Sequence, residues 1–210
     1  MKKILIALTV AIYASNFFLF IVSHSVPLSL KGKATVESPY FFEEDVAYMS
    51  KITEVASCGN CLYVLYDNKN ILSCYNLQGK YICSYYFDMS RNGNSQLYYT
   101  DDTLYLEARG HNVYAFQNGD FIAFYDSERD AHAIKKIRVQ IDTTKDLHND
   151  IQENYVRKGT SILRILPDGQ QNVVLSGPEW HIMFQNDTAF LVVNLVTLVI
   201  LYLLYRVFIK

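Results

Sequence analysis

Four cysteines are the residues of this chain best suited to chemistry, and they fall close together at Cys58, Cys61, Cys74 and Cys83. Cys58 and Cys61 flank a Gly-Asn turn, and Cys74 faces Cys83 across the next hairpin if its loop is 77–80. An even number of cysteines outside the cytoplasm favours disulfides. Two residues opposite each other in a hairpin also meet the Cα spacing that a disulfide needs. We therefore expect Cys74–Cys83 as the first disulfide and Cys58–Cys61 as the second candidate pair.

Three other roles compete for the same cysteines. Four thiolates with one short spacer could hold zinc in a tetrahedral site. The Cys58-Gly-Asn-Cys61 segment could carry out thiol-disulfide exchange, but no Lys, Arg or His lies beside it to stabilise a thiolate. Buried cysteines without any such role behave as small apolar side chains. The sequence leaves these alternatives open.

Other catalytic signatures are missing from the chain. It contains no Gly-x-Ser-x-Gly, Ser-x-x-Lys or His-Glu-x-x-His motif and no glycine-rich phosphate loop. Its five histidines are dispersed. We therefore expect no catalytic residue, no metal ligand and no cofactor.

Two apolar segments, Ile4–Val22 and Ala189–Tyr205, bracket all 21 acidic residues of the chain. The ends outside them carry only basic charges, at Lys2, Lys3, Arg206 and Lys210. Apolar stretches of this length can span a bilayer, and basic flanks stay in the cytoplasm. We expect a transmembrane helix or uncleaved signal anchor at 1–23, a second transmembrane helix at 189–206, and both termini in the cytoplasm. A cleaved signal peptide is the alternative for the first segment, although its apolar run exceeds the usual ~7–15 residues.

The stretch between the segments would then lie outside the cytoplasm. It holds 21 acidic residues against 15 basic ones, the 19 of the chain less the four at its ends, for a net charge of −6. An acidic surface repels nucleic acid phosphates, so we expect no nucleic acid partner.

A repeat of short strands organises this stretch. Aromatic and β-branched runs separated by Gly, Asn and Asp favour antiparallel strands. We expect a linker and first strand at 24–49 and a β domain at 50–188. The expected strands of this domain are 50–57, 62–66, 71–75 and 81–87, then 95–100, 103–107, 112–116 and 120–125, then 154–157, 161–165 and 172–175. Residues 137–141 also alternate like a strand and could supply an inner edge.

A four-stranded meander that returns about every 40 residues resembles a blade of a β-propeller. The resemblance covers about residues 50–175, and its motif is loose because the Trp-Asp dipeptide of one large propeller class is absent. Residues 180–191 also align with 95–106, as if a fourth blade began and gave way to the second apolar segment. Propellers close with about 4–8 blades, so the resemblance implies a partial propeller with open edges that need a cap or a partner.

The sequence thus predicts an all-β extracytoplasmic domain of blade-like meanders between two transmembrane helices. We expect a cell-membrane protein that acts as a binding or assembly module without catalytic activity. Its partners would be the lipid bilayer and either another protein or a second copy of itself. The alternatives are a thiol redox or metal-binding protein that uses Cys58 and Cys61, and a propeller-type hydrolase or lyase with acidic residues at blade turns.

Overall fold

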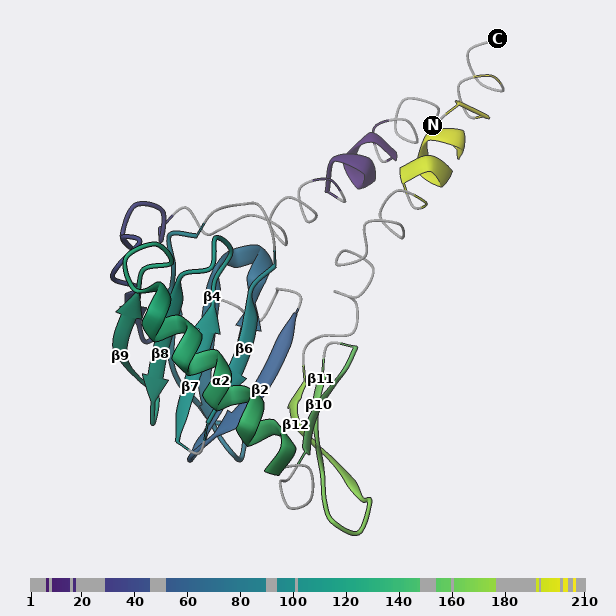
Figure 1. Cartoon of the computed structure of the whole chain (residues 1–210). Helices are drawn as coiled ribbons and strands as arrows, with labels where there is room; N and C mark the ends of the chain where they lie inside the picture. The colour runs from purple at the N-terminus through teal and green to yellow at the C-terminus, as the bar shows by residue number, and fades with distance from the viewer. Residues whose placement is uncertain are drawn as a thin grey trace. The chain divides into compact units, whose positions relative to one another are not determined.

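The computed structural model divides the chain into two compact units, Val26–Gly177 and a terminal unit made of Met1–Ser25 and Pro178–Lys210. We call the first the β unit. The structure describes residues 29–45, 52–89, 94–100, 102–147, 154–159 and 161–176 of it. In the terminal unit it describes residues 7, 9–15, 17, 192, 194–200, 202, 203 and 206 (Figure 1). The two units are considered separately.

Sheet 1 contains five antiparallel strands in the order β1-β5-β4-β3-β2. Four of them form consecutive hairpins whose turns lie where the sequence predicts, at 59–60 and 77–80 among others. The fifth, β1, pairs with β5 and lies in the segment expected to hold a first strand. The strands are β1 (Tyr40–Phe42), β2 (Glu54–Cys58), β3 (Cys61–Tyr66), β4 (Ile71–Asn76) and β5 (Tyr81–Tyr86).

Sheets 2 and 3 are the second and third copies of the predicted repeat. Sheet 2 is a four-stranded antiparallel meander, β6-β7-β8-β9, and sheet 3 has only three strands, β10-β11-β12. None of the three sheets closes on itself. The strands are β6 (Gln96–Tyr99), β7 (Thr103–Glu107), β8 (Val113–Gln117), β9 (Asp120–Tyr125), β10 (Asn154–Lys158), β11 (Ser161–Ile165) and β12 (Gln171–Ser176).

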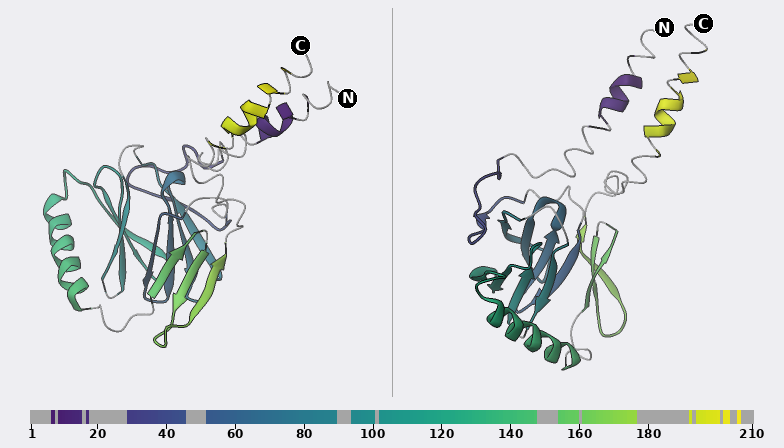
Figure 2. Two further views of the ribbon diagram at one scale, coloured as in Figure 1. Left: turned by 90° about the vertical axis from the view of Figure 1, so that its right-hand side faces the viewer. Right: turned by 45° about the horizontal axis from the view of Figure 1, so that its top comes forward.

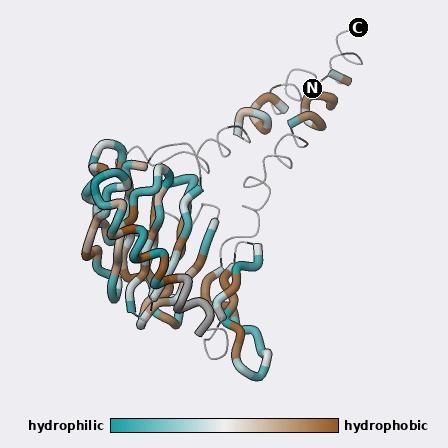
Figure 3. Tube along the Cα trace, viewed as in Figure 1, coloured by the Kyte–Doolittle hydropathy of each residue, from teal (hydrophilic) through white to brown (hydrophobic). Residues whose placement is uncertain are grey.

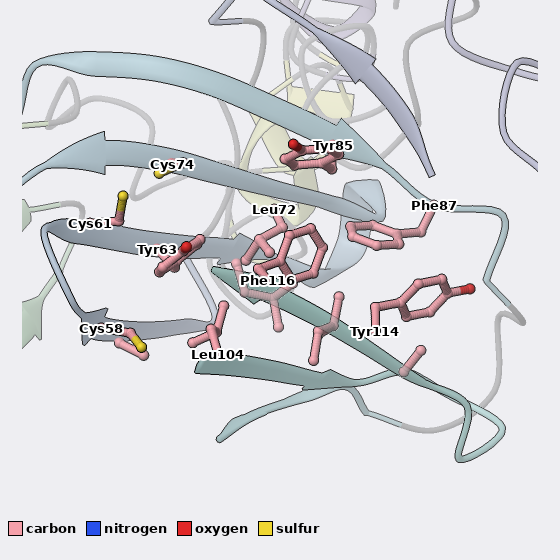
Figure 4. Close-up of a cluster of buried hydrophobic side chains, with 14 of the residues drawn as sticks. Cys58, Cys61, Tyr63, Leu72, Cys74, Tyr85, Phe87, Leu104, Tyr114 and Phe116 are labelled. Carbon is pink, nitrogen blue, oxygen red and sulfur yellow. The ribbon is translucent and has the colours of Figure 1, made fainter. Parts of the chain in front are cut away.

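Sheet 1 is the middle layer of the β unit, and both of its faces are buried. All six residues of β3 are buried, which is typical of a strand covered on two sides. One apolar cluster joins Leu72 and Phe87 of sheet 1 to Leu104, Tyr114 and Phe116 of sheet 2. Figure 4 shows these side chains pointing toward one another between the two sheets. A second cluster joins the other face of sheet 1 to sheet 3; it includes Leu62, Val64, Ile71, Ile162, Tyr155, Val174 and Leu175.

The edges of β2, β6 and β10 lie close together. Strand β2 contacts both β6 and β10, and these three are the first strands of the three repeats. Figures 1 and 2 show the sheets fanning out from this side. The arrangement is compatible with blade-like repeats.

The prediction of a strand at 137–141 is wrong, because these residues belong to a helix, α2 (Ala131–Leu147). The helix contacts β9 of sheet 2. In the turn that leads into the helix, Asp126 accepts hydrogen bonds from the backbone N–H groups of Glu128 and Arg129, both 2.9 Å long. Ile134 and Ile141 are buried, at a spacing of two helical turns. The β unit is therefore mostly β and not all-β.

The terminal unit contains helical residues at 9–15 and 194–200. Within the part of the chain that the structure describes, we find no helix that is both long and apolar enough to cross a membrane. The predicted spans 1–23 and 189–206 fall partly outside the described residues, and the predicted start of a fourth blade at 180–191 falls wholly outside them. The described residues of this unit are predominantly hydrophobic in Figure 3.

Candidate functional site

Three of the predicted site cysteines form a row across sheet 1. Cys61 lies on β3, Cys74 on β4 and Cys83 on β5, and hydrogen bonds join Cys74 to both of its neighbours. The register pairs Cys74 directly with Cys83, as the sequence predicts, and pairs Cys61 with Cys58 at the adjoining hairpin. All four cysteines are reduced thiols in the structure. We call Cys61, Cys74 and Cys83 the thiol row.

The hairpin turn between β8 and β9 covers the thiol row. Gly119 at this turn has φ +95°, and a Cβ placed there would lie 3.5 Å from the Cys74 sulfur and 3.7 Å from the Cys61 sulfur. The carbonyl oxygen of Gly119 accepts hydrogen bonds from the Cys83 thiol, at 3.7 Å, and from the Tyr85 hydroxyl, at 3.0 Å. Its N–H donates to the Tyr63 hydroxyl at 2.8 Å. The turn of sheet 2 thus covers the thiols of the row, and Figure 4 shows Cys61, Cys74 and Tyr85 on sheet 1.

The fourth cysteine lies outside the row. The Cys58 thiol donates a 3.7 Å hydrogen bond to the carbonyl oxygen of Thr100, on the segment that joins β6 to β7. Cys58 therefore contacts a different part of sheet 2 from the other three. The structure does not bring all four cysteines to one centre.

The pKa values of the thiols depend on which one donates. The thiol of Cys74 donates within the row, and this bond lowers the pKa of Cys61 to about 7 although burial raises it. The same interaction lowers the pKa of Cys83 and raises that of Cys74. A thiol has one proton, so Cys74 can stabilise only one neighbouring thiolate at a time. Burial also raises the pKa of Tyr63 and raises that of Tyr85 to about 12, so both phenols stay protonated near neutral pH.

The thiol row suits a structural role better than catalysis. Its members are only 1–4% exposed, whereas catalytic cysteines are partly exposed to their substrates. No group of three or more His, Cys, Asp or Glu side chains among the described residues could hold a metal ion. Three thiols can form at most one disulfide, and Cys74 would take part in it as the shared neighbour of the other two.

A buried ion pair joins sheet 1 to sheet 2 elsewhere in the β unit. Arg109 follows β7, and Asp67 lies in the short 3-10 helix Asp67–Lys69 after β3. The guanidinium binds both carboxylate oxygens, at 3.1 and 3.0 Å, and also donates to the Asp67 carbonyl. The two side chains are 10% and 12% exposed. Such a bidentate pair fixes the spacing of the two sheets.

A polar cluster surrounds a small cavity of about 220 Å³ beside α2, lined by His111, Ser127, Ala131, Ile134 and Arg138. Glu107 reaches both His111, at 2.9 Å, and Arg138, at 2.6 Å. The imidazole is 77% exposed and its carboxylate partner 15%. The charges of this cluster satisfy one another, so it offers no poised nucleophile.

Three polar side chains of the terminal unit are shielded from solvent, whereas Ser15 is exposed. Asn194 and Thr197 are 8% and 9% exposed, and Thr9 is half-buried. The neighbouring apolar side chains face outward; Leu195, for example, is 64% exposed. In every view the helical residues 9–15 and 194–200 run alongside each other (Figures 1 and 2).

Two residues that join sheet 2 to sheet 1 are not apparent from the sequence. From the sequence alone, Gly119 is expected to be an ordinary hairpin glycine and Arg109 an exposed charged residue. Each acts on residues more than 30 positions away, Tyr85 and Asp67 respectively. Only a signal linking distant positions could have found them.

Comparison of the chain with protein-family models, with curated proteins and with solved structures finds no match in any of the three.

Proposed function

We propose that the chain is a membrane-anchored binding or assembly module whose β unit acts outside the cytoplasm, without catalysis. The observation that carries the proposal is the reversed polarity of the terminal unit. Its described helical residues bury Asn194 and Thr197 and expose Leu195, Val196 and Val199.

The reversal suits lipid as the surrounding solvent. In water, paired helices bury their apolar stripe and expose polar side chains. In a bilayer no apolar driving force joins helices, and small or polar side chains such as Asn and Thr mediate their contact. An apolar exterior around a polar seam is therefore the pattern of a helix pair in lipid.

The distribution of charge gives the orientation. At the two ends of the chain, beyond the apolar segments, the only charged residues are Lys2, Lys3, Arg206 and Lys210. The stretch between the segments has a net charge of −6. Basic residues near membrane spans stay on the cytoplasmic side. The β unit then lies on the far side of the membrane.

A binding role fits the chemistry of the β unit. Its thiols are sealed beneath the Gly119 turn, and the cavity beside α2 is small and internally charge-paired. Binding requires only a surface, and the β unit has open strand edges that a protein partner or a second copy could use.

Thiol chemistry is the second candidate. The hydrogen bond from Cys74 lowers the pKa of Cys61 to about 7, which would favour a nucleophilic thiolate. Its 3% exposure opposes this role, because an exchange partner would have to displace the Gly119 turn first.

Topology is tested by labelling introduced cysteines in intact cells. We expect Gln170→Cys, in the exposed turn before β12, to react with a membrane-impermeant maleimide, and Lys210→Cys to react only after the membrane is permeabilised. The unsubstituted chain is the control, because its four cysteines are buried. Labelling of Lys210→Cys in intact cells, or protection of Gln170→Cys, would overturn the proposed orientation. Release of the chain by alkaline carbonate would overturn the membrane anchor.

A further inference from the structure

Among the residues that the structure describes, the third repeat has no counterpart of the strand that completes the other two. In sheets 1 and 2 the third strand of the meander, β4 or β8, is paired on its outer side by a fourth, β5 or β9. Sheet 3 ends at β12, its third strand. No described strand pairs with the outer edge of β12, so its backbone groups face the place that β5 and β9 occupy in the other repeats.

The other edges of the β unit are short, covered or charged. Strand β1 has only three residues, and β9 begins with the charged Asp120 and contacts α2. The edges of β2, β6 and β10 lie together; Glu54 accepts a hydrogen bond from the backbone N–H of Leu97 on β6, and β10 also carries Arg157 and Lys158. These are the devices by which natural sheets avoid edge pairing.

Strand β12 is the edge that these devices protect least, although its ladder with β11 is irregular at Val174, whose carbonyl oxygen lies close to Gly79 of the turn between β4 and β5. The six residues of β12, Gln-Asn-Val-Val-Leu-Ser, include no charge and no proline. Val173 is 62% exposed. Val173 also ends an apolar row that crosses sheet 3, because the register pairs Val156 with Leu163 and Leu163 with Val173.

We propose that β12 pairs with β12 of a second copy of this chain, antiparallel across a two-fold axis. The stretch between the apolar segments has a net charge of −6, so two copies repel each other over most of their surface. The uncharged edge of β12 is where they can approach. The β12 strand of a second copy is also uncharged and contains β-branched residues, so it is a suitable partner.

The register of this pairing follows from the faces of the strand. Residues opposite each other in an antiparallel pair share a face, so a two-fold axis perpendicular to the sheet must pass between equivalent residues. The axis that buries the most exposed apolar surface places Val173 opposite Val173 of the second copy. The apolar row would then run across six strands. This inference deepens the self-association included in the proposed function.

A symmetric cysteine tests the pairing directly. Opposite residues of antiparallel strands have Cα atoms about 4.5–5.5 Å apart, within the range of a disulfide. We expect full-length Val173→Cys, in detergent or in membranes, to form a covalent dimer under mild oxidation. Val156→Cys is the matched control, because it introduces the same thiol on the same face of sheet 3 but on β10, and it should remain monomeric.

Non-covalent association gives an independent readout. We expect the unsubstituted chain to have the mass of a dimer in detergent, and Val173→Lys to have that of a monomer with an unchanged melting temperature, because residue 173 is exposed. A monomeric mass for the unsubstituted chain, equal crosslinking of both cysteine variants, or crosslinking of Val173→Cys to a different protein would overturn the proposal. Its failure would leave the labelling pattern of Gln170→Cys and Lys210→Cys unchanged, so it is distinguishable from failure of the membrane topology.

Discussion

The β unit and the terminal unit bury opposite kinds of side chain. In the β unit, sheet 1 is covered on both faces by aromatic and aliphatic residues, and the buried ion pair of Asp67 and Arg109 is an exception held by several hydrogen bonds. In the terminal unit, Asn194 and Thr197 are buried and the neighbouring Leu195 and Val196 are exposed. One chain therefore follows two rules of burial, which is what the proposed membrane anchor would require. Each of the following substitutions should affect one unit and leave the other intact.

The largest expected effect is on the β unit, from Arg109→Met. This change leaves the Asp67 carboxylate buried without its cation, which typically costs ~3–5 kcal/mol of unfolding free energy. We expect a large fall in the denaturation midpoint, measured by circular dichroism of the strands in detergent. The control is Arg129→Met, whose side chain is 63% exposed and 3.6 Å from Glu37, and which should cost at most ~1 kcal/mol. Equal effects of the two substitutions would show that burial of the first pair has no energetic weight.

The next largest effect is the difference in stability between the β unit with a Cys74–Cys83 disulfide and the β unit with reduced thiols. A Cys74–Cys83 disulfide closes a loop of about 10 residues and should stabilise the β unit by ~2–3 kcal/mol, less any strain. We expect the double substitution Cys74→Ser and Cys83→Ser to lower the melting temperature of protein isolated from its own compartment. Chemical reduction of the unsubstituted protein should lower it by a similar amount and leave the terminal unit unchanged.

Mass spectrometry of the non-reduced protein decides the pairing. A Cys74–Cys83 link is expected. Unlinked thiols at both positions would refute it, and a Cys61–Cys74 link would show that the shared neighbour oxidises on its other side.

The smallest expected effect is on pairing of the terminal helices, and its sign distinguishes lipid from water as their surroundings. Replacement of Asn194 by Leu removes a buried polar group from the terminal unit. In lipid this should weaken helix pairing by ~0.6–1.7 kcal/mol, because the hydrogen-bonding side chain is lost and nothing apolar is gained. In water the same change should strengthen pairing, because it buries apolar surface. Hydrogen exchange of the terminal helices in detergent measures the sign, with Leu195→Val, at an exposed position of the same helical stretch, as the matched control.

The strands of the β unit could be predicted from the sequence because its turns are marked locally. Asn-Gly, Asp-Gly and Gly-Asn pairs end the runs of β-branched and aromatic residues, so the strand positions agree within a few residues. The facing of Cys74 and Cys83 followed from the length of one turn. The helix was missed because residues 137–141 alternate, while the buried positions Ile134 and Ile141 follow a helical spacing that begins earlier in the chain.

The stacking of the three sheets on one another could not be predicted from the sequence. A repeat specifies each sheet but not its neighbours, and the first copy, not the second, proves to be the middle layer. The covering of the thiol row by Gly119 and the pairing of Arg109 with Asp67 both depend on that stacking. These contacts join positions whose separation carries no local pattern.

The central position of sheet 1 has a consequence for the order of folding. Strands β2 to β5 pair only with sequence neighbours among themselves, so sheet 1 is rich in local contacts and should form early. Its two covering sheets are synthesised later, and until they dock it presents two apolar faces at once. The nascent chain is therefore most exposed to aggregation between the synthesis of β5 and that of β12. A pause in translation or a truncation of the chain in this interval would produce the most aggregation-prone form of the protein.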